Sequence, residues 1–262
     1  MKKLIAMLLA LTMVLALAAC TTEPATTPET TAATEPATEP ATEPATEPAA
    51  TAMTYEEFMA AELDDIVTIE SYVQATQGWW EDAIVIYLQG PDGAYFSYGT
   101  KCSEEDATKL VPGVKIRITG TKAVFNGEVE VMDGTFEFVE GADTYVAEAM
   151  DATALLGTEE LEQHMNKKVS FKGMTVAAAN DEGAAFLYKW DGSGKAGDDL
   201  YFNVTIGDQT YNFCVESYLT GDGTDVYEAV ESWKVGDVVD LEGFLYWYNA
   251  AQPHITSVTV AQ

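Results

Sequence analysis

Hydrophobic and polar residues alternate along several short stretches of this chain, a pattern that predicts β-strands with one buried face. The clearest stretch is Val114–Thr119, where Ile116 and Ile118 would face a core while Lys115 and Arg117 face solvent. An Asn-Gly dipeptide follows soon afterwards and is typical of a hairpin turn. The pattern therefore predicts a β-rich protein with tight turns.

The first half of the folded region reads as helix, three strands, helix, two strands. Thr54 and Glu57 have the spacing of a capping box, which predicts a short helix from Thr54 to about Leu63. The other predicted elements are strands at 66–73, 83–88, 94–98, 114–119 and 129–138 and a helical segment at 103–110.

The second half repeats this order. A longer polar loop separates its first strand from a hairpin, and a helix again stands between the third and fourth strands. The predicted elements are helices at 158–165 and 225–233 and strands at 169–176, 200–206, 209–215, 238–248 and 255–260.

One phrase occurs once in each half, GVKIRITGTKAVFN at Gly113–Asn126 and GDVVDLEGFLYWYN at Gly236–Asn249. In both copies a second glycine follows the first at the same spacing, and an aromatic residue precedes the final asparagine. The shared spacing indicates one module written twice. We interpret the phrase as the bend and turn of the fourth and fifth strands, since glycine permits tight bends in barrels.

We therefore predict an all-β fold with short helices: two tandem OB-fold-like five-stranded β-barrels after a signal peptide and a disordered linker. A helix between strands 3 and 4 in both halves favours this fold over two other small Greek-key or SH3-like barrels. The predicted divisions are 1–19 for the signal peptide, 20–52 for a stalk, 53–141 for the first barrel and 142–262 for the second.

The chain begins with two lysines and an apolar run that ends in LAAC, the pattern of a secretion signal. This ending resembles the lipobox of bacterial lipoproteins. The resemblance implies cleavage before Cys20 and lipidation of that residue, with the membrane as a partner. The alternative is an ordinary cleaved signal with an incidental cysteine.

Residues 21–52 contain only Thr, Glu, Pro and Ala, and TEPA occurs four times in succession. A segment without large apolar residues cannot offset the entropy of ordering, so we expect a disordered stalk. Together with the lipobox, it predicts an extracytoplasmic protein on the outer face of the cytoplasmic membrane of a Gram-positive bacterium. The phrases TYEEFMAAELDD, CSEEDATKLVPG and FKGMTV resemble uncharacterised lipoproteins of Gram-positive gut anaerobes, and this resemblance implies no activity.

The formal net charge is −30, from 43 acidic and 13 basic residues. Because nucleic-acid binding depends on Lys and Arg that neutralise phosphates, we expect nucleic acid to be disfavoured as a partner. A glycan or an envelope protein is the expected partner, and a spacer with protein partners only is the alternative. Extracellular nucleic-acid binding by the OB-fold is the third hypothesis.

Aromatic residues stand near the loops by which OB-folds bind oligonucleotides and oligosaccharides. Trp79 and Trp80 fall in the loop after the first strand, and Tyr246, Trp247 and Tyr248 approach the last turn. These five residues are the candidate ligand-binding positions. The alternative is that their rings close the barrel ends, since Trp is usually largely buried.

No pattern predicts catalysis. His164 and His254 are separated in the pattern, and no nucleophile or metalloprotease motif is present. We expect no enzymatic activity, no cofactor and no metal site. Cys102 and Cys214 are expected to be buried thiols, although a bridge between them remains an alternative.

Overall fold

The computed structural model describes residues 51–260, which lie in one compact unit. The expected signal peptide, Cys20 and nearly all of the stalk lie outside the described residues. Among the residues described, no helix has the length and apolar character needed to cross a membrane.

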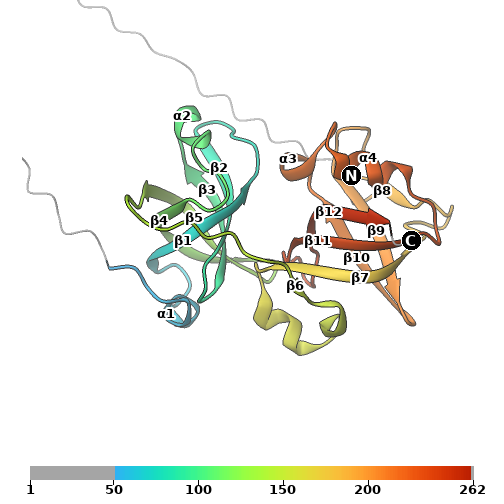
Figure 1. Cartoon of the computed structure of the whole chain (residues 1–262), viewed down its shortest axis with the longest axis horizontal. Helices are drawn as coiled ribbons and strands as arrows, with labels where there is room; N and C mark the ends of the chain where they lie inside the picture. Colours follow the sequence, from blue (N-terminus) through green and yellow to red (C-terminus); the bar gives the residue numbers. More distant parts are fainter. Residues whose placement is uncertain (1–50, 261–262) are drawn as a thin grey trace, which may run out of the picture. The chain divides into compact units, whose positions relative to one another are not determined.

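The first half forms a closed five-stranded barrel (Figure 1). The strands are joined in the order β1-β2-β3-β5-β4, and β1 closes the barrel against β4. The β3–β5 pair is parallel, and α2 stands between β3 and β4 in the chain. Its elements are α1 (Tyr55–Ala60), β1 (Ile66–Thr76), β2 (Ala83–Gln89), β3 (Ala94–Lys101), α2 (Glu104–Ala107), β4 (Lys115–Phe125) and β5 (Glu128–Phe138).

The second half has the same topology. β7 pairs with β9 and β11, and β10 pairs in parallel with β12, so the five main strands also close. The additional strands β6 and β8 extend the sheet. Its elements are β6 (Met150–Asp151), η1 (Thr153–Leu155), η2 (Glu159–His164), β7 (Lys168–Ala177), β8 (Phe186–Tyr188), β9 (Leu200–Ile206), β10 (Gln209–Val215), α3 (Ser217–Thr220), α4 (Asp225–Ser232), β11 (Val238–Phe244) and β12 (His254–Val260).

The predicted pair of OB-fold-like barrels is thus confirmed. Helix α1 begins where its capping box predicts, because the Thr54 side chain accepts from the Glu57 backbone and Glu57 accepts from the Thr54 backbone. This helix buries Phe58 in the core of the first barrel. The second barrel has a separate core of its own.

The repeated phrase has the same structural role in both barrels: its first glycine precedes the fourth strand, and its second allows that strand to bend. Gly113 and Gly236 precede the fourth strand with φ of +94° and +99°. Gly120 and Gly243 lie at irregular positions where the fourth strand bends against the fifth. At Gly243 an added Cβ would lie 2.1 Å from the His254 carbonyl oxygen, so only glycine fits this close approach.

Two local predictions were wrong. The capped helix predicted at 158–165 is the 3₁₀ helix η2 (Glu159–His164) without a side-chain cap, and the strand predicted to reach Tyr248 ends at Phe244. Sequence analysis also missed α3, β6 and β8, which are too short to show a period. Cys102 and Cys214 are buried and unbridged, so the prediction of two buried thiols is confirmed and the bridge alternative is wrong.

The two barrels share a third, smaller apolar cluster. Tyr87 of β2 stacks on Phe244 of β11 with ring centroids 4.6 Å apart, and Phe96 of β3 contacts Tyr87 edge-on. Nearby, the Lys168 backbone N–H donates to the Gln89 side chain over 2.7 Å. The barrels are therefore packed together by buried side chains as well as joined by the chain.

We expect Gly243→Ala to destabilise the protein by about 2–3 kcal/mol, because the new methyl group must displace backbone in a closed barrel. Urea unfolding followed by circular dichroism measures this loss. Gly207→Ala is the matched control: its site is open, so it costs only the left-handed backbone, about 1 kcal/mol. Equal losses in the two variants would contradict the close-approach explanation.

Candidate functional site

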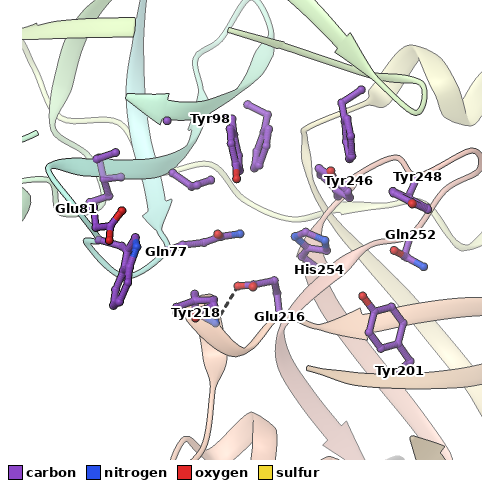
Figure 2. Close-up of a pocket in the computed structure, with 18 residues that line it drawn as sticks. Gln77, Glu81, Tyr98, Tyr201, Glu216, Tyr218, Tyr246, Tyr248, Gln252 and His254 are labelled. Atoms are coloured by element: carbon purple, nitrogen blue, oxygen red, sulfur yellow. Dashed lines mark hydrogen bonds between the residues drawn. The ribbon is translucent and has the colours of Figure 1, made fainter. Parts of the chain in front are cut away.

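A groove of about 650 Å³ lies between the two barrels (Figure 2). One wall comes from β2, β3 and the loop before β2, and the other from α3 and the segment between β11 and β12. Aromatic side chains dominate this lining. They are Trp80, Phe96, Tyr98, Phe125, Tyr201, Tyr218, Tyr246 and Tyr248.

The floor of the groove is built from packed rings. Tyr246 stacks on His254 with centroids 4.2 Å apart, and Phe96 meets Tyr246 edge-on at 5.2 Å. His254 Nδ1 shares a hydrogen bond of 2.6 Å with the Tyr87 hydroxyl. Burial lowers the pKa of His254 to about 3, so its ring is neutral and the floor carries no positive charge.

The rim carries aromatic side chains that remain open to solvent. The exposed fractions are 68% for Trp80, 66% for Tyr218, 53% for Tyr98, 52% for Phe125 and 45% for Tyr248. Large rings are seldom left so exposed around one concave surface, and exposed apolar patches of this kind mark binding sites.

A tight turn places Trp80 at the rim. The Trp80 and Ala83 backbones exchange two hydrogen bonds, of 3.0 and 2.9 Å. Between them, Glu81 and Asp82 both adopt left-handed backbone, with φ of +47° and +63°. Two non-glycine residues in this region cost conformational energy, and such strain persists mainly where the surroundings enforce it. The turn therefore holds Trp80 in a fixed position beside Glu81.

Helix α3 places Tyr218 on the opposite wall. Glu216 caps this helix, because its Oε2 accepts from the Tyr218 backbone N–H at 2.9 Å (Figure 2). The Tyr218 carbonyl in turn accepts from the Gly78 N–H of the first barrel at 3.0 Å. The wall is thus tied across the groove by a backbone hydrogen bond.

A second cavity of about 530 Å³ continues the groove along the second barrel. It shares Tyr201, Tyr248 and Gln252 with the first and ends at Trp190, whose side chain is also exposed. A ligand longer than one ring system could therefore extend from the first cavity into the second.

The charge of the groove is negative. Glu81 and Glu216 line it, and no Lys or Arg side chain does so among the described lining residues. Burial, followed by the repulsion of Asp199, raises the pKa of Glu216 to about 7. The Glu216 carboxyl is accordingly held next to the groove without a cationic partner.

Two further carboxyls lie beside the contact between the barrels. Glu128 is fully buried; its Oε2 accepts from the Trp247 backbone N–H at 2.8 Å, and its other oxygen has no described hydrogen-bond partner. Burial raises the pKa of Glu128 to about 8, and burial together with Asp133 raises that of Glu130 to about 7. Glu128 therefore binds a proton at neutral pH.

The structure brings three of the five candidate residues together at the groove, namely Trp80, Tyr246 and Tyr248. Trp79 instead packs on the core of the first barrel and donates from Nε1 to the Cys102 carbonyl at 2.8 Å. Trp247 packs over Gly127 in the hairpin of the first barrel. Their binding roles stay predictions, but neither side chain is among the residues that line the groove.

Sequence analysis missed the groove residues Tyr98, Tyr201, Tyr218 and Phe125. The sequence did contain one signal for Phe125. Phe125 precedes the asparagine in the first copy of the repeated phrase, which is the position that Tyr248, a candidate residue, occupies in the second copy. The two rings lie 6.0 Å apart in the structure. Tyr218 carried no signal, since α3 is a single turn.

Catalytic and metal-binding groups do not converge among the described residues. No group of three or more His, Cys, Asp or Glu side chains there could hold a metal ion. His164 lies on η2 and shares a 3.1 Å contact with the Lys167 amine, outside the groove lining.

No family model matches the chain, and no curated protein matches it either. Solved structures do match. A murine DNA-binding protein bound to double-stranded DNA is 13% identical, with a TM-score of 0.33, over 75% of this chain and all of that one. The Ifi202 HINa domain in complex with double-stranded DNA is 9% identical, with a TM-score of 0.33, over 76% of this chain and 96% of that one.

A deletion variant of the single-stranded DNA-binding protein from Thermus aquaticus also matches, at 9% identity and a TM-score of 0.26, over 76% of this chain and 96% of that one. Our expectation that nucleic acid is disfavoured as a partner is corrected, because proteins bound to DNA are among these matches. At such low similarity the matches do not identify a ligand, which must be argued from the groove.

We expect stability to fall as pH rises from about 6.5 to 8, the range above the pKa of a free His and up to the raised pKa of Glu128. A free Glu has a pKa of about 4.5, so between that pH and 8 the folded chain holds protons on Glu128 that the unfolded chain has released, and unfolding is favoured as pH rises. His254 has the opposite effect. Because its pKa is 6.5 in the unfolded chain and about 3 in the folded one, only the unfolded chain takes up this proton as pH falls below about 6.5, and stability decreases.

Thermal melts from pH 4 to 9 measure this profile. Glu128→Gln keeps an acceptor for the Trp247 N–H and cannot ionise, so the fall above about pH 6.5 should shrink by about 2 kcal/mol. Glu140→Gln, at an exposed position, should leave the profile unchanged. A Glu128→Gln profile that matches the unmodified protein would contradict the role of this carboxyl.

Proposed function

We propose that residues 53–260 act as a non-catalytic binding module whose ligand lies in the groove between the barrels and stacks on its aromatic rim. The observation that carries this proposal is the set of five exposed rings around one concave surface, contributed by both barrels. Exposed rings offer large contact areas at low entropic cost, which suits binding.

Non-catalytic binding is supported by the chemistry of the groove. His254 is neutral and already shares a hydrogen bond with the Tyr87 hydroxyl. The described lining holds no nucleophile next to a base. The volume of about 650 Å³ falls within the range of small-molecule sites.

Single-stranded nucleic acid is a second candidate ligand. The observation that favours it is the pair of neighbouring cavities, which share Tyr201 and Tyr248 and are lined by aromatic side chains that include Trp80 and Trp190. Nucleobases stack on such rings in OB-folds, at about 1–3 kcal/mol per base. Phosphates of a bound strand would have to remain on the solvent side, away from Glu81 and Glu216.

Trp80→Ala should weaken ligand binding about tenfold without unfolding the protein, because the ring is exposed and supports no core. Calorimetric titration of the full chain measures this loss. The probes are single-stranded oligonucleotides and small cyclic or alkyl compounds, with and without a charge. Leu63→Ala is the control, since Leu63 is exposed on the first barrel outside the groove lining. Undiminished binding to Trp80→Ala would place the ligand elsewhere.

We also propose that the module is held at the outer face of a bacterial cytoplasmic membrane by lipid on Cys20. The lipobox-like LAAC and the stalk sequence support this proposal. Palmitate labelling of expressing cells should mark the unmodified chain and should be lost in Cys20→Ala. Equal labelling of both chains would refute the anchor.

A further inference from the structure

We propose that the groove binds an organic cation, an alkylated ammonium group held by the aromatic rim with Glu216 as its counter-charge. This inference rests on the proposed binding function and names the chemical class of its ligand.

The rim offers the π faces that such a cation needs. An ammonium group within about 6 Å of a ring centroid is attracted by the negative face of the ring, most strongly for Trp and Tyr. Trp80 from one barrel and Tyr218 and Tyr248 from the other line the same groove. Aromatic rings therefore line the groove on both of its walls.

Glu216 supplies the opposing charge. One of its oxygens caps α3 by accepting from the Tyr218 N–H, and none of the described ion pairs involves Glu216. Glu81 adds a second carboxylate at the rim. The described ion pairs engage Lys109, Lys115, Arg117 and Lys172, all outside the groove. The groove is thus a site with negative charge and no internal cation to balance it.

Electrostatics at longer range act in the same direction. A chain with a net charge of −30 attracts cations and raises their local concentration in a cleft lined by carboxylates. A bound cation would also favour the ionised form of Glu216, whose pKa is raised to about 7 by burial, so binding would release part of a proton near neutral pH.

An organic cation fits better than a metal ion. Calcium and magnesium require six or more oxygen ligands, including water, arranged around the ion. The groove presents ring faces instead, and no metal-binding group of side chains exists among the described residues. Alkyl groups on the ammonium can stay in contact with these rings, so the cation need not keep a full hydration shell.

The experiment titrates the full chain calorimetrically with choline and with 3,3-dimethylbutan-1-ol, which has the same shape and no charge. Choline should bind at least about tenfold more tightly than the alcohol. Glu216→Gln, which preserves an acceptor for the Tyr218 N–H, should weaken choline binding about tenfold and leave the alcohol unaffected. Glu228→Gln, at an exposed position of α4 outside the groove, is the matched control.

The outcomes separate this inference from the proposed function. Equal affinity for choline and the alcohol, or no effect of Glu216→Gln on choline, would overturn the cation site. Oligonucleotide binding that depends on Trp80, with no choline binding, would also overturn it while the binding groove itself stands. Loss of choline binding in Trp80→Ala and Glu216→Gln, with unchanged melting temperatures, is the supporting result.

Discussion

The contact between the Asn126-Gly127 hairpin and the segment after β11 holds the two barrels together, and the groove depends on it. Trp247 lies over Gly127, where an added Cβ would be 2.7 Å from the ring, so the residue must be glycine. The Asn249 N–H donates to the Asn126 carbonyl at 2.6 Å, and the Trp247 N–H donates to Glu128. These contacts fix the aromatic side chains of one wall relative to those of the other.

The same contact confines polar groups that water would otherwise solvate. Glu128 is buried with only one of its oxygens satisfied, and His254 is buried as a neutral ring. A buried oxygen without a hydrogen bond, such as the second one of Glu128, lowers stability relative to an apolar interface, whereas the His254 ring is hydrogen-bonded to Tyr87. The presence of both groups beside the groove floor indicates that the interface between the barrels was not shaped for stability alone.

The fold could be predicted from the sequence because its signals are local and repeated. Alternating residues, the Thr54–Glu57 capping box and the paired glycines each specify backbone geometry within a few positions. The groove could not be predicted in the same way. Phe125 and Tyr248 lie far apart in the chain, and their approach depends on how the barrels dock, which no periodicity encodes.

Exposed and buried aromatic residues look alike in a sequence. Trp79 and Trp80 are neighbours, yet the first packs on a core and the second lines the groove, because successive side chains point in different directions. The prediction that both form one binding loop treated them as a unit. The positive φ angles at Glu81 and Asp82, which turn the chain after Trp80, are likewise not coded by the glycines that usually allow such backbone.

The repeated phrase has one more consequence. Asn126 and Asn249 are equivalent positions of the two copies, and so are Phe125 and Tyr248; in each case the equivalents contact each other. Contacts between equivalent residues characterise an isologous interface, such as that of a two-fold symmetric dimer. In a dimer of identical chains every substitution appears on both sides of the axis. Here both halves belong to one polypeptide, so one wall can carry Trp80 and the other Tyr218, and the groove can be asymmetric.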